Sequence, residues 1–561
     1  MKDKISLLLS SLVPLKKEEI EKLIEIPKNL DLGDYAFPCF ILAKKLKKNP
    51  AQIAEEISKK IKSQNFEKIK SIGPYINFSI DRKLIASQVL KKILKEKDKY
   101  GSHDVKGKVV LEFPSPNTNK PLHIGHARNI ILGQSVKKIL EFYGGNVKIV
   151  NLNNDRGIHI CKSMVAYAKF GKADSPQKAK KKSDHFIGDY YVLFSQKAKE
   201  NPSLEKEAQD CLQRWESRDK KITALWKKMN SWAFSGFKET YKKFGYKASK
   251  EYFESKIYKE GKNIINKGLK NGILKKKEDG AVFADLKDEG LGEKILLRAD
   301  GTSIYITQDL YLALLRYKEL SFDKSIYVSA SEQNHHFKTL FAILKLLGFK
   351  WASRLYHLNY GMVNLESGRM KSREGNVVDA DDLIAEMEYL ALKELDSRYK
   401  DLLKKEKLMR AEAIAMAALR YYFLKIDRAK DIIFKPEESI SFEGDTGSYL
   451  LYTYARARSI LRKADYKPKK FEIKKINDKE KALIISLSAF PEIAEHAYSE
   501  LNPSLIAHYS YNISQMFNEF YHSSQVIGSQ EENFRLTLVS AFAYVLKNAL
   551  SLLGIQVIEK M

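Results

Sequence analysis

Residues 108–153 read KVVLEFPSPNTNKPLHIGHARNIILGQSVKKILEFYGGNVKIVNLN. An apolar run of strand length ends in a proline-rich turn, and an amphipathic helical pattern follows from about His126 to Tyr143. Gly144 and Gly145 are typical of a helix stop, and a second apolar run of strand length comes directly after them. Strand, helix and strand in this order predict a βαβ unit and therefore a parallel sheet.

The turn and the start of this helix have the pattern of a phosphate-binding site. A helix N-terminus presents unpaired N–H groups and the positive end of the helix dipole, both of which favour phosphate. His123 and His126 are three residues apart, so both can donate to a pentavalent phosphate from one face of the first turn. Lys120 adds a positive charge, and Gly125 leaves room for a base or ribose to approach the backbone.

Two plainer interpretations of this histidine pair compete with phosphate binding. The histidines can be surface residues that cap a helix, or they can bind a metal ion. The agreement of strand, turn, glycine, lysine and helix favours phosphate binding over a simple cap. Metal binding is disfavoured because no third ligand lies nearby in the sequence.

Composition bounds the class of protein. The chain has 561 residues, enough for about three to five domains. Hydrophobic residues at 44% and aromatic residues at 11% exclude a disordered or low-complexity chain. The net charge of +28 indicates a polyanionic partner, although nearly all of the excess is lysine and a lysine-rich background contributes. The charge is uneven: residues 1–110 hold 24 basic and 14 acidic residues, whereas residues 481–561 hold 4 and 7.

Cysteine usage and the absence of targeting signals point to a cytoplasmic protein. Cys39, Cys161 and Cys211 lie far apart, which argues against a disulfide framework and a structural zinc site. No run approaches 18 consecutive apolar residues, so we expect no membrane span. The opening MKDKISLLLSSLVPLKKEE lacks a small-residue cleavage site and predicts a first helix rather than a signal peptide.

Longer motifs resemble a known family. The string E-F-x-S-P-N-x-x-K-P-L-H-I-G-H at 112–126 resembles arginyl-tRNA synthetases, and HIGH is the first signature of class I aminoacyl-tRNA synthetases. The second signature, KMSKS, is expected after a late strand, where GRMKSREGN stands at 368–376. This version has Arg369 and Ser372 where the class has its two lysines. In the arginyl family the lysine before HIGH, here Lys120, is thought to replace the second of them.

The resemblance implies a multidomain α/β fold with three parts. A small N-terminal α/β domain that contacts tRNA is expected over residues 1–104, where YINFSI reads as a strand. A Rossmann-like parallel-sheet catalytic domain is expected over 105–385, with a helical insertion at about 172–255. An all-α anticodon-binding bundle is expected over 386–561. We expect a monomer, because no coiled-coil or exposed apolar element indicates a second copy.

The implied reaction has two steps. The carboxylate of L-arginine attacks the α-phosphate of ATP, which enters with Mg²⁺, and forms arginyl-adenylate and pyrophosphate; tRNA(Arg) then takes the arginyl group and AMP is released. We expect no metal bound by the protein itself. The residues that the resemblance assigns to catalysis are Lys120, His123, His126 and Lys371. Those assigned to ATP are Gly125, His336, Met362, Val363, Ser372 and Arg373, with Met362 and Val363 acting through backbone groups.

Charge chemistry independently supports an arginine ligand, because a guanidinium is best held by carboxylates. Glu112 ends the strand that leads to HIGH, and Tyr305 and Asp309 are four apart at the start of a helical pattern. Gln333 follows another strand end, the usual place for ligand contacts in an open parallel sheet. The resemblance adds Ser115 and Asn117 to this site. The plainer alternatives are a helix N-terminal acid for Asp309 and a strand-end charge in water for Glu112.

Contacts with tRNA are predicted at both ends of the chain. In the front domain the candidates are Tyr75, Asn77 and Phe78, although Tyr75 and Phe78 read as core residues without the resemblance. The string GDTGSYLLYTYARARSILRKA at 444–464 resembles the start of the family's anticodon-binding bundle. The candidates there are Tyr452, Tyr454, Arg456 and the last residue, Met561.

Three other functions remain open at this point. The chain can be an inactive relative that binds RNA, a HIGH-bearing nucleotidyltransferase that acts on a small molecule, or a class I synthetase for another amino acid. The intact HIGH and 112–117 strings disfavour the first. The tRNA-type flanking domains disfavour the second, and the paired acidic residues disfavour the third.

Overall fold

The computed structural model describes residues 2–27, 29, 32–62, 66–80, 82–171, 174–364, 378–399 and 402–561. The chain divides into two compact units. The larger unit comprises residues 101–456, 491–512 and 546–561, and the smaller comprises 1–100, 457–490 and 513–545. The expected division at 104 and 385 stays a prediction.

The larger unit is built on a five-stranded sheet, and every neighbouring pair in it is parallel, as predicted. Its order is β11-β10-β4-β5-β6, with the bounds β4 Lys108–Glu112, β5 Asn146–Asn153, β6 Lys250–Phe253, β10 Lys324–Ala330 and β11 Leu355–Tyr360. Along the chain, β5 and β6 are added on one side of β4, and β10 and β11 are then added on its other side. β4 and β10 therefore meet at the switch point, where a crevice opens beyond their carboxyl ends.

Helix α6 (Ile124–Phe142) differs from the amphipathic helix expected here, because it is buried around most of its circumference. Its polar side chains bond to segments that surround it. Asn129 donates to the carbonyl of Val328 at 2.8 Å, and Ser135 donates to that of Leu552 at 2.7 Å. Gln134 likewise donates to the carbonyl of Phe244 at 3.0 Å. The helix is thus enclosed by the sheet and by later helices of the same unit.

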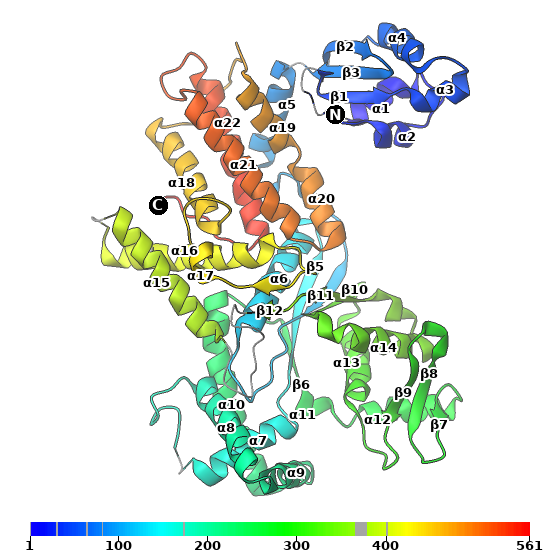
Figure 1. The fold of residues 1–561 in the computed structure, drawn as a ribbon, viewed down its shortest axis with the longest axis vertical. Helices are drawn as coiled ribbons and strands as arrows, with labels where there is room; N and C mark the ends of the chain where they lie inside the picture. Colours follow the sequence, from blue (N-terminus) through cyan, green and yellow to red (C-terminus); the bar gives the residue numbers. More distant parts are fainter. Residues whose placement is uncertain are drawn as a thin grey trace. The chain divides into compact units, whose positions relative to one another are not determined.

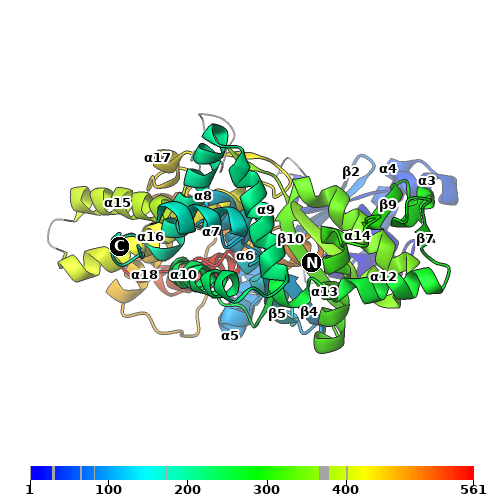
Figure 2. The same ribbon diagram turned by 90° about the horizontal axis from the view of Figure 1, so that it is seen from below.

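Two groups of elements flank the sheet (Figure 1). The first contains α7 (Ile158–Phe170), α8 (Ser183–Glu200), α9 (Ser203–Glu216) and α10 (Lys220–Phe244), which also lie together in Figure 2. The expected insertion at 172–255 needs correction, because its end includes β6, which pairs with β5 as part of the sheet. Periodicity could not separate a four-residue strand from the helices around it.

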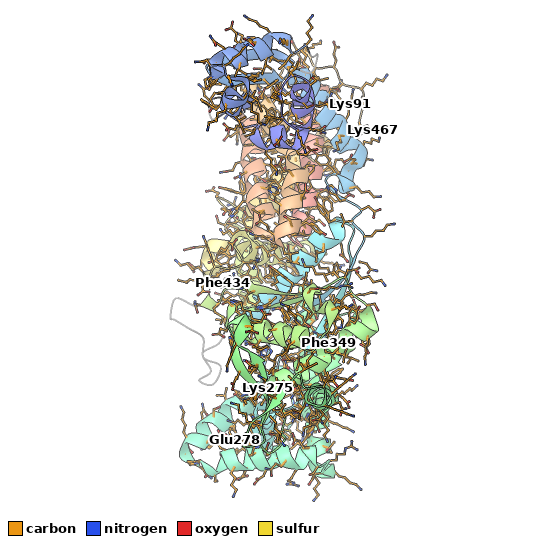
Figure 3. The ribbon with its side chains drawn as sticks, turned by 90° about the vertical axis from the view of Figure 1, so that its right-hand side faces the viewer. Lys91, Lys275, Glu278, Phe349, Phe434 and Lys467 are labelled. Carbon is orange, nitrogen blue, oxygen red and sulfur yellow. The ribbon has the colours of Figure 1, made fainter. Side chains whose placement is uncertain are left out.

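The second group contains α11 (Glu254–Ile257), α12 (Gly261–Lys270), α13 (Tyr305–Leu320), α14 (Asn334–Leu346) and a three-stranded antiparallel sheet of β7 (Lys275–Lys276), β8 (Val282–Leu286) and β9 (Gly292–Leu297). Its core includes Trp351, whose ring lies 5.3 Å from that of Phe349, labelled in Figure 3. Lys275, also labelled there, pairs with Asp285 across this small sheet at 3.0 Å.

The remainder of the chain is almost entirely helical, as expected from about residue 380. The helices are α15 (Ala380–Arg398), α16 (Lys404–Lys425), α17 (Pro436–Ser439), α18 (Gly447–Lys463), α19 (Asp478–Ser488), α20 (Phe490–Glu500), α21 (Ser504–Ser523) and α22 (Glu532–Leu552). One short parallel pair, β12 (Val363–Asn364) with β13 (Ile432–Ile433), interrupts this pattern. Beside it, Phe434 stacks on Phe423 with ring centroids 5.6 Å apart (Figure 3).

The smaller unit has an antiparallel sheet of order β1-β3-β2. Its elements before residue 100 are α1 (Lys2–Ser10), α2 (Lys17–Leu23), β1 (Tyr35–Pro38), α3 (Phe40–Leu46), α4 (Pro50–Lys60), β2 (Phe66–Ile72), β3 (Tyr75–Ile80) and α5 (Arg82–Glu96). The predicted strand YINFSI is β3. Later helices join this unit: Lys481 of α19 pairs with the buried carboxylate of Asp34 at 2.5 Å.

Across the described part of the chain, no helix combines the length and the apolar character needed to cross a membrane.

Arg128 of α6 is among the largest fully buried side chains, and backbone carbonyls satisfy its guanidinium. It donates to the carbonyls of Gly361 and Met362, the latter at 3.2 Å. It also donates to those of Arg428 at 3.2 Å and Lys430 at 2.9 Å. One side chain thus holds the segment after β11 and the segment before β13 against the helix.

Replacing this guanidinium should destabilise the larger unit strongly. Arg128→Met removes the guanidinium donor from four carbonyls, although those of Met362 and Arg428 keep a backbone donor. We expect the free energy of unfolding to fall by about 3 kcal/mol or more. Urea unfolding of the full chain measures this. Arg214→Met is the matched control, because its exposed pair with Asp219 should change stability by about 0.5 kcal/mol or less. Equal midpoints for the two variants would contradict the prediction.

Candidate active site

A cleft of about 400 Å³ lies at the carboxyl ends of β4 and β10, where the sheet order predicts a ligand site. Residues from the sheet edge, the start of α6 and the segment after β11 line it. Those that the sequence predicted are Glu112, Ser115, His123, Gly125, His126, Asp309, Gln333, His336, Met362 and Val363. The fold therefore brings together most of the predicted phosphate and arginine contacts.

The two HIGH histidines cap α6 reciprocally, which fixes their tautomers. The Nδ1 of His123 accepts from the amide of Gly125 at 3.1 Å. The Nδ1 of His126 accepts from the amide of His123, also at 3.1 Å. Because both Nδ1 atoms accept, each neutral ring carries its proton on Nε2. A Cβ at Gly125 would lie 3.0 Å from the ring of His123, so glycine keeps this arrangement possible.

Electrostatics keep these rings neutral. Burial, with a smaller contribution from Lys120, lowers the pKa of His123 to about 3. Burial also lowers the pKa of His126 well below its usual value, assisted by the charges of His123 and Lys120. The pKa of Lys120 is itself lowered by burial. The site therefore offers two neutral N–H donors beside one lysine.

Glu112 meets a cation, but that cation belongs to the protein itself. Its Oε2 pairs with Arg316 of α13, which is fully buried, and its Oε1 accepts from the Ser115 hydroxyl at 3.0 Å. The guanidinium of Arg316 also lies over the rings of Tyr252 and Tyr327, at 5.1 and 5.6 Å. The strand-end charge is thus balanced internally, which the sequence alone did not reveal.

A second recess of about 310 Å³ adjoins the cleft. Asn154, Asp309, Gln333 and His336 line both spaces. The recess is further lined by Asn117, Arg156, Glu254 and Tyr305, together with residues 157–160. Tyr305 begins α13 and Asp309 follows it by one turn, as the four-residue spacing predicted. The Oδ2 of Asp309 lies 2.8 Å from the Nε2 of His336.

Glu254 is a site residue that sequence reasoning missed. It follows β6 directly and is only 7% exposed, and its carboxylate lies 3.7 Å from the guanidinium of Arg156. Burial raises the pKa of Glu254 to about 7, with Arg156 opposing the shift and the charges of Asp155 and Asp309 adding to it. The available signal was an acid at the end of a sheet strand, but β6 was hidden within the expected insertion.

The remaining predicted ATP contacts lie after β11, and only the first two, Met362 and Val363, are among the described residues. Met362 has both backbone groups engaged: its amide donates to Asp431 at 2.6 Å, and its carbonyl accepts from Arg128 and Ile432. This leaves Val363 as the predicted backbone contact for adenosine. Lys371, Ser372 and Arg373 lie outside the described residues, as does Arg369.

The predicted tRNA contacts of the front domain need correction. Phe78 is fully buried, with its ring 5.1 Å from that of Phe66, and Asn77 is 5% exposed. Both side chains are buried within the front domain, so neither can contact a base without local unfolding. Tyr75 stays a candidate because it is partly exposed, and Phe40, 54% exposed, packs edge-on against it at 5.6 Å.

The two predicted tyrosines of α18 also differ in their exposure. Tyr454 is 3% exposed and donates to Glu559 at 3.1 Å, so its prediction as a stacking residue is wrong and it instead holds the C-terminal segment. Tyr452 is partly exposed, and the Arg456 guanidinium lies 4.7 Å from its ring. Met561 is also partly exposed. Tyr452, Arg456 and Met561 therefore stay predictions.

One group of potential metal ligands occurs among the described residues. Ligand atoms of Asp184, His185 and Asp381 lie within 4.8 Å of one another. However, the ammonium of Lys182 donates to both Asp184 and Asp381, at 2.9 and 2.8 Å. A cation of the protein therefore already bridges these carboxylates.

Three known domain families match the chain. The arginyl-tRNA synthetase N-terminal domain matches residues 1–80, and the catalytic domain of class I tRNA synthetases (R) matches 89–435. The DALR anticodon-binding domain matches residues 450–561. Together these matches span the chain nearly from end to end.

Individual proteins agree with this. The arginine–tRNA ligase of Treponema denticola is 45% identical over 96% of this chain and 94% of its own length. That of Borreliella burgdorferi is 41% identical over 100% and 99%. The arginyl-tRNA synthetase of Thermus thermophilus superposes with a TM-score of 0.81 at 26% identity, covering 100% of this chain and 99% of that one. The chain therefore belongs to the arginyl-tRNA synthetases, a family of class I aminoacyl-tRNA synthetases.

Proposed function

We propose that the cleft binds ATP and the carboxylate end of L-arginine, and that the adjoining recess binds the arginine guanidinium. The chain attaches arginine to tRNA(Arg) with ATP, through arginyl-adenylate, and releases AMP and pyrophosphate. One juxtaposition supports the site assignment most directly. A helix N-terminus with two N–H donors shares a sheet edge with a recess that contains Asp309 and Glu254.

The phosphate half of the site works by hydrogen bonding rather than by proton transfer. The Nε2–H groups of His123 and His126 donate to oxygens of the α-phosphate as the arginine carboxylate attacks it. Their Nδ1 atoms are held by backbone amides, so the donors are oriented before ATP arrives. Lys120 supplies the nearby positive charge, and we assign Lys371, Ser372 and Arg373 to the leaving pyrophosphate.

The guanidinium half of the site works by charge. Two carboxylates, Asp309 and Glu254, line the recess. Its polar lining also includes the predicted contacts Asn117, Tyr305 and Gln333. A guanidinium has five N–H donors in a plane and is matched by carboxylates on its edges. Glu112 and Ser115 line the cleft instead, where they suit the α-amino end of the same substrate.

The rest of the assignment concerns tRNA, metal and assembly. We assign the three parts 1–104, 105–385 and 386–561 to tRNA contact, catalysis and anticodon binding. Tyr75 with the exposed Phe40, and Tyr452 with Arg456 and Met561, are accessible groups suited to nucleotides. Mg²⁺ enters bound to ATP, with no metal site on the protein. The chain acts as a cytoplasmic monomer.

The decisive experiment is ATP–pyrophosphate exchange with each of the twenty amino acids, with and without tRNA. Of the twenty amino acids, we expect only arginine to support exchange. This exchange should depend strongly on added tRNA, as the family resemblance implies. Exchange with a different amino acid, or none with arginine and tRNA together, would reject the proposed function.

Removing one histidine donor should reduce the rate of adenylate formation. We expect His126→Ala to lower kcat for exchange about 100–1000-fold, because one preorganised donor to the reacting phosphate is lost. His335→Ala is the control, since this exposed histidine on α14 lines neither space and should stay within about twofold. A His126→Ala variant within about threefold of the parent would refute the role.

Arginine binding should weaken as the pH falls below about 7. The pKa of Glu254 is raised to about 7 in the free protein, so its carboxyl becomes neutral below that pH and stops attracting the guanidinium. We expect the KM for arginine to be about tenfold higher at pH 6 than at pH 8. His123, with a pKa of about 3, adds no inflection to kcat over this range.

Glu254→Gln should show a high KM that no longer varies with pH between 6 and 8. Glu251→Gln, an exposed acid on the same strand, should behave as the parent does. A parent KM that is flat over this range, or a Glu254→Gln variant that retains the slope, would contradict the assignment of Glu254.

A further inference from the structure

Six charged side chains meet where α8, α10 and the start of α15 come together, outside the cleft and the recess. The three cations and three anions are Lys182, His185, Lys243, Asp184, Asp379 and Asp381. We propose that this group, called here the charge cluster, positions the HIGH histidines by holding residues 378–380 beside them. Its members are positioning residues, and their role rests on the proposed function of His123 and His126.

Asp381 is the point at which the helical group reaches α15. Its Oδ2 accepts from the ammonium of Lys182 at 2.8 Å and from the hydroxyl of Thr240 at 2.9 Å. Its Oδ1 lies 3.3 Å from the ammonium of Lys243. Lys182 also donates to Thr240 at 2.7 Å and to Asp184 at 2.9 Å. Side chains from α10 and from the start of α8 therefore bind the Asp381 carboxylate of α15.

Asp379 connects the same cluster to the start of α15. Its Oδ1 accepts from the amide of Asp381 at 2.7 Å and so caps the helix. Its Oδ2 lies 3.3 Å from the Nε2 of His185, which is also 3.6 Å from the Oδ2 of Asp381. The close carboxylates of Asp379 and Asp381 raise the pKa of His185 to about 10, so this histidine is charged at neutral pH.

The cluster is ionised and internally balanced. Burial opposes the charge of Asp381, but the nearby His185 and the hydrogen-bonded Lys182 outweigh it, so the pKa of Asp381 is lowered. With three cations facing three anions, no charge is left over for a metal ion. The pairs are partly or fully buried, with exposed side-chain fractions of 1% for Asp184 and 12% for Asp381.

The helices are closely packed around the cluster. Asp184 lies against Gly236 of α10, where an added Cβ would approach its Oδ1 to 2.2 Å. Any larger residue at 236 would push Asp184 away, so the helices meet closely at this point. The cluster is therefore built into the packing of α8 on α10, unlike the exposed ion pairs elsewhere on these helices.

Two backbone hydrogen bonds link the cluster to the phosphate site. The amide of Ile124 donates to the carbonyl of Val378 at 3.0 Å, and the amide of Ala380 donates to that of Leu122 at 2.9 Å. His123 and Asp379 face each other in the antiparallel bridge between these bonds. The residue whose ring donates to phosphate is thus paired with the residue whose carboxylate belongs to the cluster.

This link should affect catalysis more than arginine binding. Donors to a developing charge must lie within about 2.7–3.1 Å of it, and a misplacement of about 1 Å can cost about 100-fold in rate. The recess that binds the guanidinium is lined by residues after β5, by Glu254 and by α13, none of which belongs to 378–380. Loosening the cluster should therefore lower kcat and leave the KM for arginine nearly unchanged.

The test uses the full chain with tRNA in ATP–pyrophosphate exchange. We expect Asp381→Asn and Lys182→Met each to lower kcat tenfold or more while the KM for arginine stays within twofold. In hydrogen exchange, the amides of Ile124 and Ala380 should exchange at least tenfold faster in both variants. Lys182→Arg should recover most of the activity and the protection, since it keeps the charge.

Asp189→Asn is the matched control, because it removes an exposed ion pair between Asp189 of α8 and Lys181, which precedes that helix. It should match the parent in all three readouts. Unchanged kcat in folded Asp381→Asn and Lys182→Met would overturn the proposal, as would unchanged protection of both amides. Should either variant fail to fold, Lys182→Gln decides by the same readouts. Failure of the proposed function can be told apart from failure of this proposal. If the proposed function is wrong, the parent itself shows no arginine-dependent exchange, whereas the amide protection can still be compared between the variants.

Discussion

A buried guanidinium must be surrounded by acceptors, and Arg128 finds them in backbone carbonyls that lie 233 and about 300 residues further along the chain. Its helix, α6, begins at the HIGH histidines, so the same element presents the phosphate donors and holds the segment after β11. Gln134 and Arg420 continue this pattern, since both donate to the carbonyl of Phe244 at the end of α10. The larger unit is therefore organised around a helix whose polar side chains Arg128, Asn129, Gln134 and Ser135 bond to surrounding segments, while its first turn faces the cleft.

The site separates two kinds of electrostatics. At the phosphate end, burial removes charge from the histidines and leaves neutral donors, which can approach a negatively charged nucleotide without gaining or losing a proton. In the recess proposed for the guanidinium, burial raises the free energy of the Glu254 carboxylate, so a cationic partner would stabilise it. Burial thus has two effects within one crevice: it keeps the histidine donors neutral, and it destabilises the Glu254 carboxylate until a cation binds.

The sequence predicted the parts of the site that local chemistry determines. Strand, turn and helix around His123 follow from apolar periodicity and helix-end chemistry, and Tyr305 with Asp309 follows from a four-residue spacing at a helix start. Burial was not predictable in the same way. Phe78 and Tyr454 were predicted to contact tRNA, yet their neighbours in the fold bury them, whereas the predicted contacts Tyr75 and Tyr452 stay partly exposed. Glu254 was missed because a strand of four residues carries no periodicity of its own.

The arrangement of internal arginines explains how a protein can leave carboxylates available for an external one. Arg316 is fully buried and is held by Glu112 and two tyrosine rings, so it cannot reach the recess. Arg156 lines the recess, but it bonds to Glu216 at 2.5 Å and lies 4.1 Å from the ring of Tyr258. At 3.7 Å from Glu254 it moderates the burial cost of that carboxylate without a close hydrogen bond. Arg316 and Arg156 therefore both have stronger partners elsewhere, which suits the proposed binding of a guanidinium in the recess.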